Sequence, residues 1–293
     1  MSTGFDPNDN RPPDAAATGS RTSVRVDSDM PDPLNPRIER FLTRRTGRCA
    51  VRGPNDPARA RELWVVLHGY AQLASRFLAG FGTIDDGSRL IVAPEALSRF
   101  YDARTPVASH VDAEVGASWM TREDRTDEIE DQLHWLRQVV ATYRARVGDT
   151  VPLTVLGFSQ GAAAASRWVA RGDVGPAHLI CWGASLAPEL DLTEGSPLAR
   201  TRCTVVVGAR DLFVSAEQVA QERARLDAAG FAYTFERFAG GHRLDDATLA
   251  RVAGVAGVAG GVSCALAWAM KPRASAAAMM VRRNEVFMAV MVF

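Results

Sequence analysis

The residues whose types and spacing are most suggestive of chemistry form the run Gly157-Phe158-Ser159-Gln160-Gly161. A serine between two glycines can stand on a tight strand-to-helix turn, because residues without a Cβ let the two elements approach closely. Such a turn exposes the serine hydroxyl and makes Ser159 the candidate nucleophile. The alternative is an ordinary Gly-Ser turn, but a predicted strand before the run and a predicted helix after it favour the nucleophile.

A serine nucleophile needs a base, and the base needs an acid that orients it. In sheets that carry such a turn, the order along the chain is serine, acid, histidine. Only His178 and His242 follow Ser159, and His178 opens an apolar run where a structural role is the better interpretation. Asp211 directly follows an apolar run, at the sheet edge where sites of this fold class lie. We therefore predict Ser159, Asp211 and His242 as a triad; the alternatives are a capping or loop acid and a solvent-exposed loop histidine.

A tetrahedral oxyanion needs preorganised hydrogen-bond donors. One expected donor is the backbone N–H of Gln160, the residue after the nucleophile. The second is expected in the loop that follows the apolar run 63–67, where the backbone N–H of Tyr70 is the candidate. The Tyr70 side chain then faces the acyl pocket; an exposed aromatic in a turn is the alternative.

The elements that must position these residues alternate along the chain. Buried strands are predicted over 63–67, 90–92, 151–156, 178–182, 203–208 and 233–238, and an edge strand over 48–52. Helices are predicted over 72–79, from a capping box at 121–124 to 147, over 162–170 and over 215–229. Alternating strands and helices predict an α/β fold: one domain over about 45–250, with a mostly parallel sheet covered by helices on both faces.

A stretch with little periodicity, residues 93–120, interrupts this alternation and is predicted to be a long irregular loop. Its large side chains, Phe100, Tyr101, Trp119 and Met120, are expected to line the substrate pocket, because such pockets are mainly apolar. The alternative is that they only pack the loop onto the core.

The composition limits the classes of partner. Among 293 residues, 34 basic and 34 acidic side chains give a net charge of zero, so we expect no nucleic-acid partner. Four cysteines without C-x-x-C spacing predict neither a metal site nor a disulfide framework. No metal or organic cofactor is expected.

Both ends of the chain differ from the middle. Residues 1–36 are rich in Asp, Pro, Ser and Thr and are predicted to be a disordered leader; without a signal-peptide pattern, the expected location is the cytoplasm. Residues 252–293 form an appended tail of unknown structure. Val252–Met270 lacks charged residues, but its four glycines and single leucine favour a soluble helix or an irregular tail over a membrane span.

Four motifs together resemble the phospholipase/carboxylesterase family of α/β-hydrolases: the runs 67–70, 157–161, 208–211 and 241–242. The resemblance covers roughly 48 to 250, and the runs 93–101 and 116–121 more narrowly resemble a bacterial esterase subgroup. It implies the α/β-hydrolase fold, the triad and oxyanion residues named above, and a place for Trp119 in the lining of the site. The chain departs from many members at Ala71-Gln72, where they have Gly-Asp.

These observations together predict a serine hydrolase that cleaves small-molecule carboxylic esters through an acyl-enzyme. The alternatives are an acyl-thioesterase or lysophospholipase with the same triad, and a non-catalytic binding protein with the hydrolase fold. The sequence leaves open the acyl chain length, the alcohol and the oligomeric state, a homodimer included.

Overall fold

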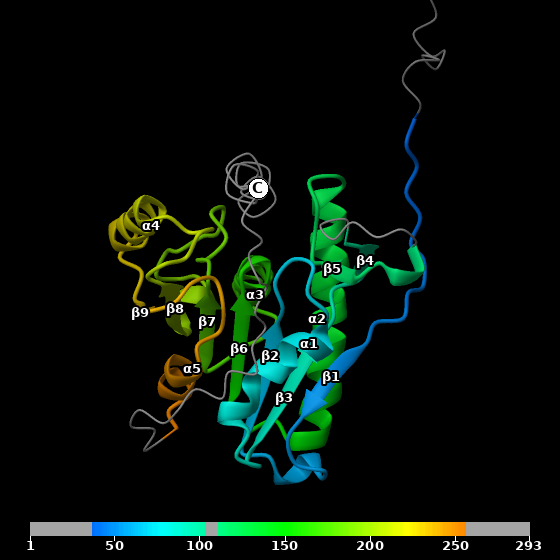
Figure 1. The fold of residues 1–293 in the computed structure, drawn as a ribbon, viewed down its shortest axis with the longest axis horizontal. Helices are drawn as coiled ribbons and strands as arrows, with labels where there is room; N and C mark the ends of the chain where they lie inside the picture. Colours follow the sequence, from blue (N-terminus) through cyan, green and yellow to red (C-terminus); the bar gives the residue numbers. More distant parts are fainter. Residues whose placement is uncertain (1–36, 103–109, 256–293) are drawn as a thin grey trace, which may run out of the picture. The chain divides into compact units, whose positions relative to one another are not determined.

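The computed structural model describes residues 37–102 and 110–255 (Figure 1). The chain divides into two units, Met1–Arg44 and Arg45–Phe293, and all elements below belong to the second. The predicted leader 1–36 and the tail from 256 onward lie outside the described residues. Within the described ranges, no helix has both the length and the apolar character that crossing a membrane requires.

A seven-stranded sheet forms the centre of the second unit, in the order β1-β3-β2-β6-β7-β8-β9. Only β1 runs antiparallel to its neighbour; all other pairs are parallel. The strands are β1 Cys49–Arg52, β2 Glu62–Leu67, β3 Arg89–Pro94, β6 Leu153–Phe158, β7 His178–Trp182, β8 Arg202–Gly208 and β9 Thr234–Phe238. The predicted α/β class and the mostly parallel sheet are confirmed.

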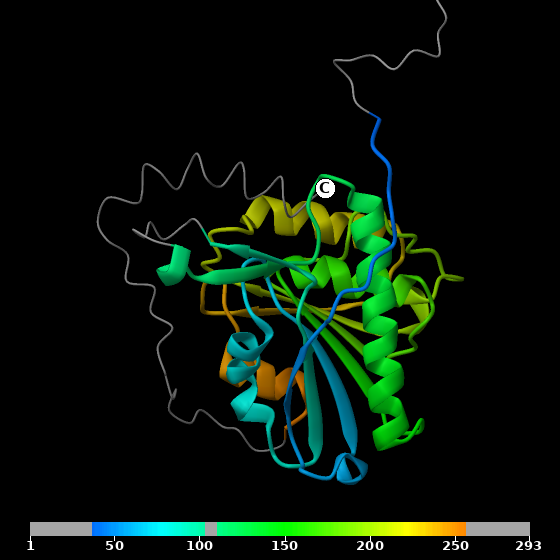
Figure 2. The same ribbon diagram turned by 90° about the vertical axis from the view of Figure 1, so that its right-hand side faces the viewer.

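Two apolar layers bury the two faces of the sheet. Alternate residues of β2 point to opposite faces: Leu63 and Val65 join one buried cluster, whereas Trp64 and Val66 join the other. The first cluster packs against α2 Arg125–Val147, α3 Gln160–Ala170 and α4 Ala216–Ala228, and the second against α1 Ala74–Leu78 and α5 Asp246–Val252. Figure 2 shows α2 and α5 on opposite sides of the sheet. Because both faces are covered, the central strands are continuous apolar runs.

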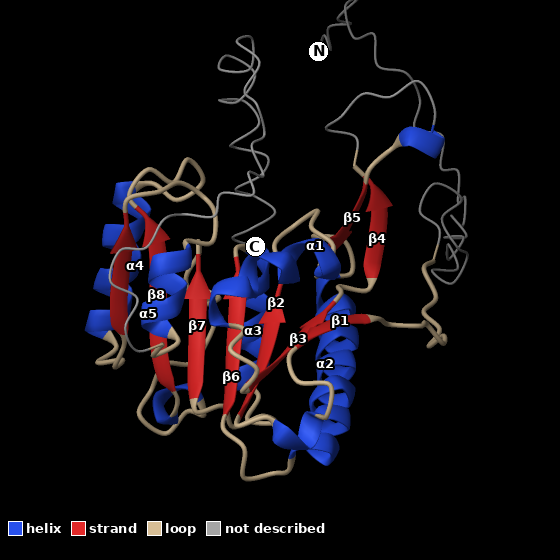
Figure 3. Cartoon of the chain, turned by 60° about the horizontal axis from the view of Figure 1, so that its bottom comes forward, coloured by secondary structure: helices blue, strands red, loops and turns tan. Residues whose placement is uncertain are grey.

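The segment predicted to be an irregular loop contains a two-stranded antiparallel pair, β4 Ser98–Tyr101 and β5 Val115–Ser118. The loop prediction is therefore wrong at these two strands. Four residues are too few to show a reliable alternation of apolar and polar side chains. Figure 3 shows the pair beyond the end of the sheet to which β6 and β7 point.

The predicted start of α2 is also wrong. The helix begins at Arg125, and Asp124 before it has a left-handed backbone with φ 47° and makes no side-chain cap. The Thr121 hydroxyl donates to the Glu128 carboxylate at 3.0 Å. The Thr121 backbone N–H donates to the same carboxylate. The Thr121 side chain therefore ties the preceding turn to the helix surface and does not cap its first N–H groups. The first helix is also shorter than the predicted 72–79: Leu73 before it has an extended backbone, and the chain after Leu78 tightens into a 3₁₀ helix over Ala79–Ile84.

Candidate functional site

Ser159 lies on the turn between β6 and α3 with φ 56° and ψ −121°. This backbone conformation is sparsely populated by residues other than glycine and costs about 1–3 kcal/mol. The Ser159 N–H donates to the Trp182 carbonyl at 2.7 Å, and the Ser159 carbonyl accepts from the Ala162 N–H at 2.9 Å. These bonds to β7 and α3 keep the strained turn in place.

Both glycines of the pentapeptide are required by close backbone contacts. A Cβ at Gly157 would lie 2.2 Å from the Gly161 carbonyl oxygen. A Cβ at Gly161 would lie 2.4 Å from the Leu67 carbonyl oxygen, at the end of β2. The motif is thus explained by packing: α3 starts directly against β6 and β2.

The structure brings the three predicted triad residues together. The His242 Nε2 atom lies 2.9 Å from Ser159 Oγ, and His242 Nδ1 lies 2.8 Å from Asp211 Oδ2. The Asp211 side chain is fully buried, whereas the His242 side chain remains 13% exposed. The arrangement can therefore pass a proton from the serine hydroxyl to the imidazole while the carboxylate stays shielded from water.

Backbone donors and aromatic rings fix the orientation of Asp211 and His242. The Asp211 Oδ1 atom accepts hydrogen bonds from the N–H groups of Phe213 at 2.8 Å and Val214 at 3.2 Å. This leaves Oδ2 facing His242. The imidazole also contacts the rings of Phe158 and Phe213, at centroid distances of 4.9 and 4.8 Å.

The two predicted oxyanion donors come from the start of α3 and from the loop after β2. Gln160 is the first residue of α3, so no preceding helical carbonyl can accept its N–H. Tyr70 lies in the loop after β2, which is shaped by the left-handed Ala71 with φ 60°. The Gly69 N–H donates to the Gln72 side-chain oxygen at 2.7 Å. Gln72, at one of the two positions that depart from the family pattern, thus stabilises the turn.

His68 shapes the same loop. The sequence places it in the run 67–70 but does not indicate this role. It is fully buried, and its Nε2 accepts from the Ala96 N–H at 3.0 Å. Its Nδ1 must then carry the proton that is shared with the Gly69 carbonyl at 2.8 Å. Burial lowers the pKa of His68 to about 4, so the imidazole stays neutral and rigidly placed.

The four predicted pocket residues separate into two groups. The half-buried Phe100 stacks on Tyr70 at 5.1 Å, and the neighbouring Tyr101 is 58% exposed. Trp119 and Met120 are each only 3% exposed and belong to the core cluster that contacts α2 and α3. The exposed group can border a substrate; the buried group contacts the elements that carry the site.

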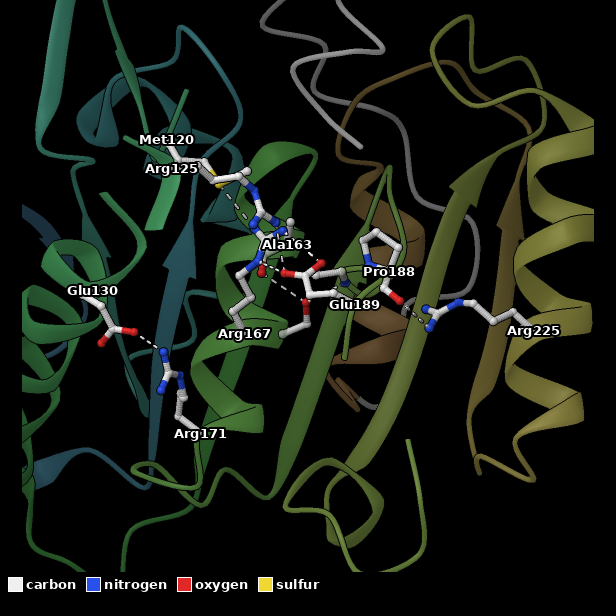
Figure 4. A network of polar contacts seen from close by, with 11 residues as sticks. Met120, Arg125, Glu130, Ala163, Arg167, Arg171, Pro188, Glu189 and Arg225 are labelled. Carbon is white, nitrogen blue, oxygen red and sulfur yellow. Dashed lines mark hydrogen bonds and ion pairs between the residues drawn. The ribbon is translucent and has the colours of Figure 1, made fainter. Parts of the chain in front are cut away.

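A charged network that no sequence motif indicates fixes the segment after β7 (Figure 4). The buried Arg167 of α3 donates to Glu189 at 2.6 Å, and Arg125 donates to the same carboxylate at 3.1 Å. Burial, the largest single influence, would raise the pKa of Glu189, but the hydrogen bond from Arg167, a backbone hydrogen bond and the charges of Arg167 and Arg125 together hold that pKa below its usual range. Arg225 of α4 donates to the Pro188 carbonyl at 3.5 Å, from the other side of the segment. This segment begins at Gly183, where a Cβ would lie 3.0 Å from His242 Cε1.

His178 lies away from the triad, at the start of β7, and its Nε2 is 2.8 Å from Thr204 Oγ1. Within residues 37–102 and 110–255, no three His, Cys, Asp or Glu side chains gather in a way that could hold a metal ion.

Comparison with known proteins gives matches in structure but not in sequence. No protein-family model matches the chain, and neither does any curated protein sequence. Acyl-protein thioesterase 2 of Zea mays is 19% identical, with a TM-score of 0.52 over 71% of this chain and 99% of its own. A phospholipase/carboxylesterase from Dyadobacter fermentans is 18% identical, with a TM-score of 0.50 over 73% and 98%. The Bacillus cereus carboxylesterase is 11% identical, with a TM-score of 0.50 over 70% and 91%.

These solved structures match the fold of the chain over about 70% of its length. At identities this low the likeness concerns the fold. The chain has the α/β-hydrolase fold.

Proposed function

We propose that the protein is a serine hydrolase that cleaves carboxylic esters through an acyl-enzyme. The observation that carries this proposal is the continuous hydrogen-bonded chain Ser159–His242–Asp211 at a strained strand-to-helix turn. A strained turn of this kind lowers the stability of the folded protein. A binding protein has no need of a nucleophile, a base and an orienting acid joined by hydrogen bonds. This argues against the non-catalytic alternative.

The geometry supports the following sequence of steps. His242 Nε2 accepts the Ser159 proton as Oγ attacks the acyl carbon, and Asp211 stabilises the resulting imidazolium. The negative charge that develops on the carbonyl oxygen is accommodated by the backbone N–H groups of Gln160 and Tyr70. The imidazolium protonates the departing alkoxide as the acyl–oxygen bond to the alcohol breaks. In the second half of the reaction His242 takes a proton from a water molecule that attacks the acyl carbon, and returns it to Ser159 Oγ as the acyl–Oγ bond breaks and the carboxylic acid leaves.

The substrate class rests on the apolar side chains beside this centre. Tyr70 and the ring of Phe100 stacked on it offer an apolar wall for an acyl or alcohol group. Thioesters and lysophospholipids would use the same machinery, and one structural neighbour is described as an acyl-protein thioesterase.

The test is a rate comparison on p-nitrophenyl esters from acetate to decanoate, together with acyl thioesters of matched chain length. We expect turnover of the esters and a loss of several orders of magnitude in Ser159→Ala, with a melting temperature close to that of the wild type. A higher kcat/KM on the matched thioesters would assign the protein as a thioesterase. No turnover of either substrate class would contradict the proposal.

A further inference from the structure

The short segment Ala117–Met120, at the end of β5 and just after it, lies between the two loops that carry the proposed oxyanion donors. One loop follows β2 and contains Tyr70; the other is the turn that places Gln160 at the start of α3. The sequence gives no reason to connect these two loops, because about ninety residues separate Tyr70 from Gln160. In the structure, hydrogen bonds from this segment reach both.

On the side of the nucleophile, the buried Gln160 side chain holds the segment with both ends of its amide. Its Oε1 accepts from the Trp119 backbone N–H at 3.0 Å, and its Nε2 donates to the Met120 carbonyl at 2.9 Å. The Ser118 hydroxyl completes the contact, since it accepts from Gln160 Nε2 at 3.1 Å. Gln160, whose backbone N–H is a proposed oxyanion donor, is therefore anchored through its own side chain.

On the side of the oxyanion loop, the same segment makes two further hydrogen bonds. The indole Nε1 of Trp119 donates to the His68 carbonyl at 2.8 Å, two residues before Tyr70. The Ala117 carbonyl accepts from the Ala71 N–H at 2.9 Å, one residue after Tyr70. The peptide units around Tyr70 are thus held on both sides of the proposed donor.

We propose that Trp119 is a positioning residue that fixes the separation of the two oxyanion donors. The inference rests on the proposed function. Its physical basis is a continuous path: the Gln160 side chain holds the Trp119 backbone, and the Trp119 indole holds the His68 carbonyl at the base of the other loop. Oxyanion donors act only when they lie about 2.7–3.1 Å from the developing charge, so a small change in their separation weakens transition-state binding. The ground-state ester, which carries no such charge, is bound almost equally well.

The test is Trp119→Phe, which retains an aromatic ring and removes the N–H donor. We expect kcat to fall by about tenfold or more while KM stays within about twofold. We also expect the inhibition constant of an alkyl trifluoromethyl ketone to rise by the same factor as kcat/KM falls. That ketone adds to the serine and places a tetrahedral oxyanion on the same donors.

Trp64→Phe is the matched control. Trp64 is equally buried, and its indole also donates one hydrogen bond, to Glu62 at 2.9 Å, but it packs in the cluster on the other face of the sheet. We expect this variant to lose melting temperature and to keep the wild-type kcat and inhibition constant. If Trp119→Phe behaves like Trp64→Phe, Trp119 is only a core residue and the inference is overturned.

Gln160→Ala provides the second test, because it keeps the backbone donor and removes the side-chain anchor. Two successive links of one path should not act independently, so we expect the double variant with Trp119→Phe to lose less activity than the product of the two single losses. A fully multiplicative loss would contradict the single path.

The outcomes also separate this inference from the proposed function. A wild-type protein that neither turns over esters nor binds the trifluoromethyl ketone would overturn both. An active wild type with an equally active Trp119→Phe variant would overturn the positioning role alone.

Discussion

Replacing Asp211 by Asn should reverse the imidazole tautomer of His242. Asp211 Oδ1 accepts two backbone N–H groups, from Phe213 and Val214. An asparagine must present its carbonyl oxygen to those donors, because its NH₂ group cannot accept. The NH₂ group then faces His242 Nδ1, which becomes an acceptor, and the ring proton moves to Nε2. An Nε2–H donates to Ser159 Oγ and cannot take up the proton of the attacking hydroxyl.

The size of the effect follows from the loss of the base and of the charge beside it. The wrong tautomer in a serine–histidine–acid site lowers kcat by about 10,000-fold. At 1.36 kcal/mol for each factor of ten, this corresponds to about 5.4 kcal/mol of transition-state stabilisation. The free energy of unfolding should change little, because the asparagine has nearly the same shape and keeps both loop hydrogen bonds.

The assay is kcat on a p-nitrophenyl ester for the purified variant, with its melting temperature measured in parallel. Asp191→Asn is the matched control, since the exposed Asp191 carboxylate also accepts a backbone N–H two residues ahead, from Thr193 at 2.9 Å, but in the described part of the chain it has no hydrogen bond to a histidine. We expect this control to keep wild-type activity. If Asp211→Asn keeps a tenth or more of the wild-type kcat, the carboxylate does not set the tautomer and the reasoning fails.

Three further perturbations test other parts of the site. Gly157→Ala should prevent the turn from forming and lower the melting temperature strongly, because the new Cβ would lie 2.2 Å from a backbone oxygen. Gly175→Ala is the control: its Cβ would meet open space, so its melting temperature should stay near that of the wild type. Burial lowers the pKa of both His68 and His178 from 6.5 to about 4, so between these two pH values the unfolded chain binds more protons than the folded protein. The free energy of unfolding should therefore fall as the pH drops from 6.5 to about 4, by as much as about 3 kcal/mol for each histidine. Urea unfolding curves that coincide at pH 7 and pH 4.5 would contradict this. Phe100→Ala should change the ratio of kcat/KM between short and long acyl esters, since one methylene in an apolar pocket is worth about 1–3 kcal/mol; equal losses on every ester would show that Phe100 does not contact the acyl chain.

The sheet could be predicted from the sequence because its strands are buried on both faces. Leu63–Leu67 and His178–Trp182 are continuous apolar runs, and each became a strand within one residue of the predicted bounds. The candidate triad could be assembled in the same way. The carboxyl ends of parallel strands meet at one edge, so a serine after β6 and an acid after β8 are brought close together by the topology alone.

The parts that the sequence did not reveal depend on contacts between distant segments. The β4–β5 pair is held partly from outside, by the Ala71 N–H that donates to Ala117 and by Gly116, where a Cβ would lie 2.7 Å from Ala71. The capping box predicted at 121–124 was wrong for the same reason, a contact that lies outside the local pattern. The Thr121 hydroxyl has a tertiary partner, Glu128, seven residues ahead, which local spacing rules do not consider.

The aromatic residues illustrate the limit most clearly. The sequence shows that Phe100 and Trp119 are large and apolar, but it does not show which of them faces a substrate. The structure buries Trp119 in the core and gives its indole N–H to the His68 carbonyl. No pattern in the sequence specifies that hydrogen bond, because it joins residues that are 51 positions apart.

The most direct test of the central claim is to find the residue that forms the covalent intermediate. The protein is treated with a fluorophosphonate, which reacts preferentially with an activated serine, and the modified residue is located by peptide mass spectrometry. We expect one adduct per chain, on Ser159, together with complete loss of ester hydrolysis and no adduct in Ser159→Ala. An adduct on a different serine, or unchanged labelling of Ser159→Ala, would contradict the account.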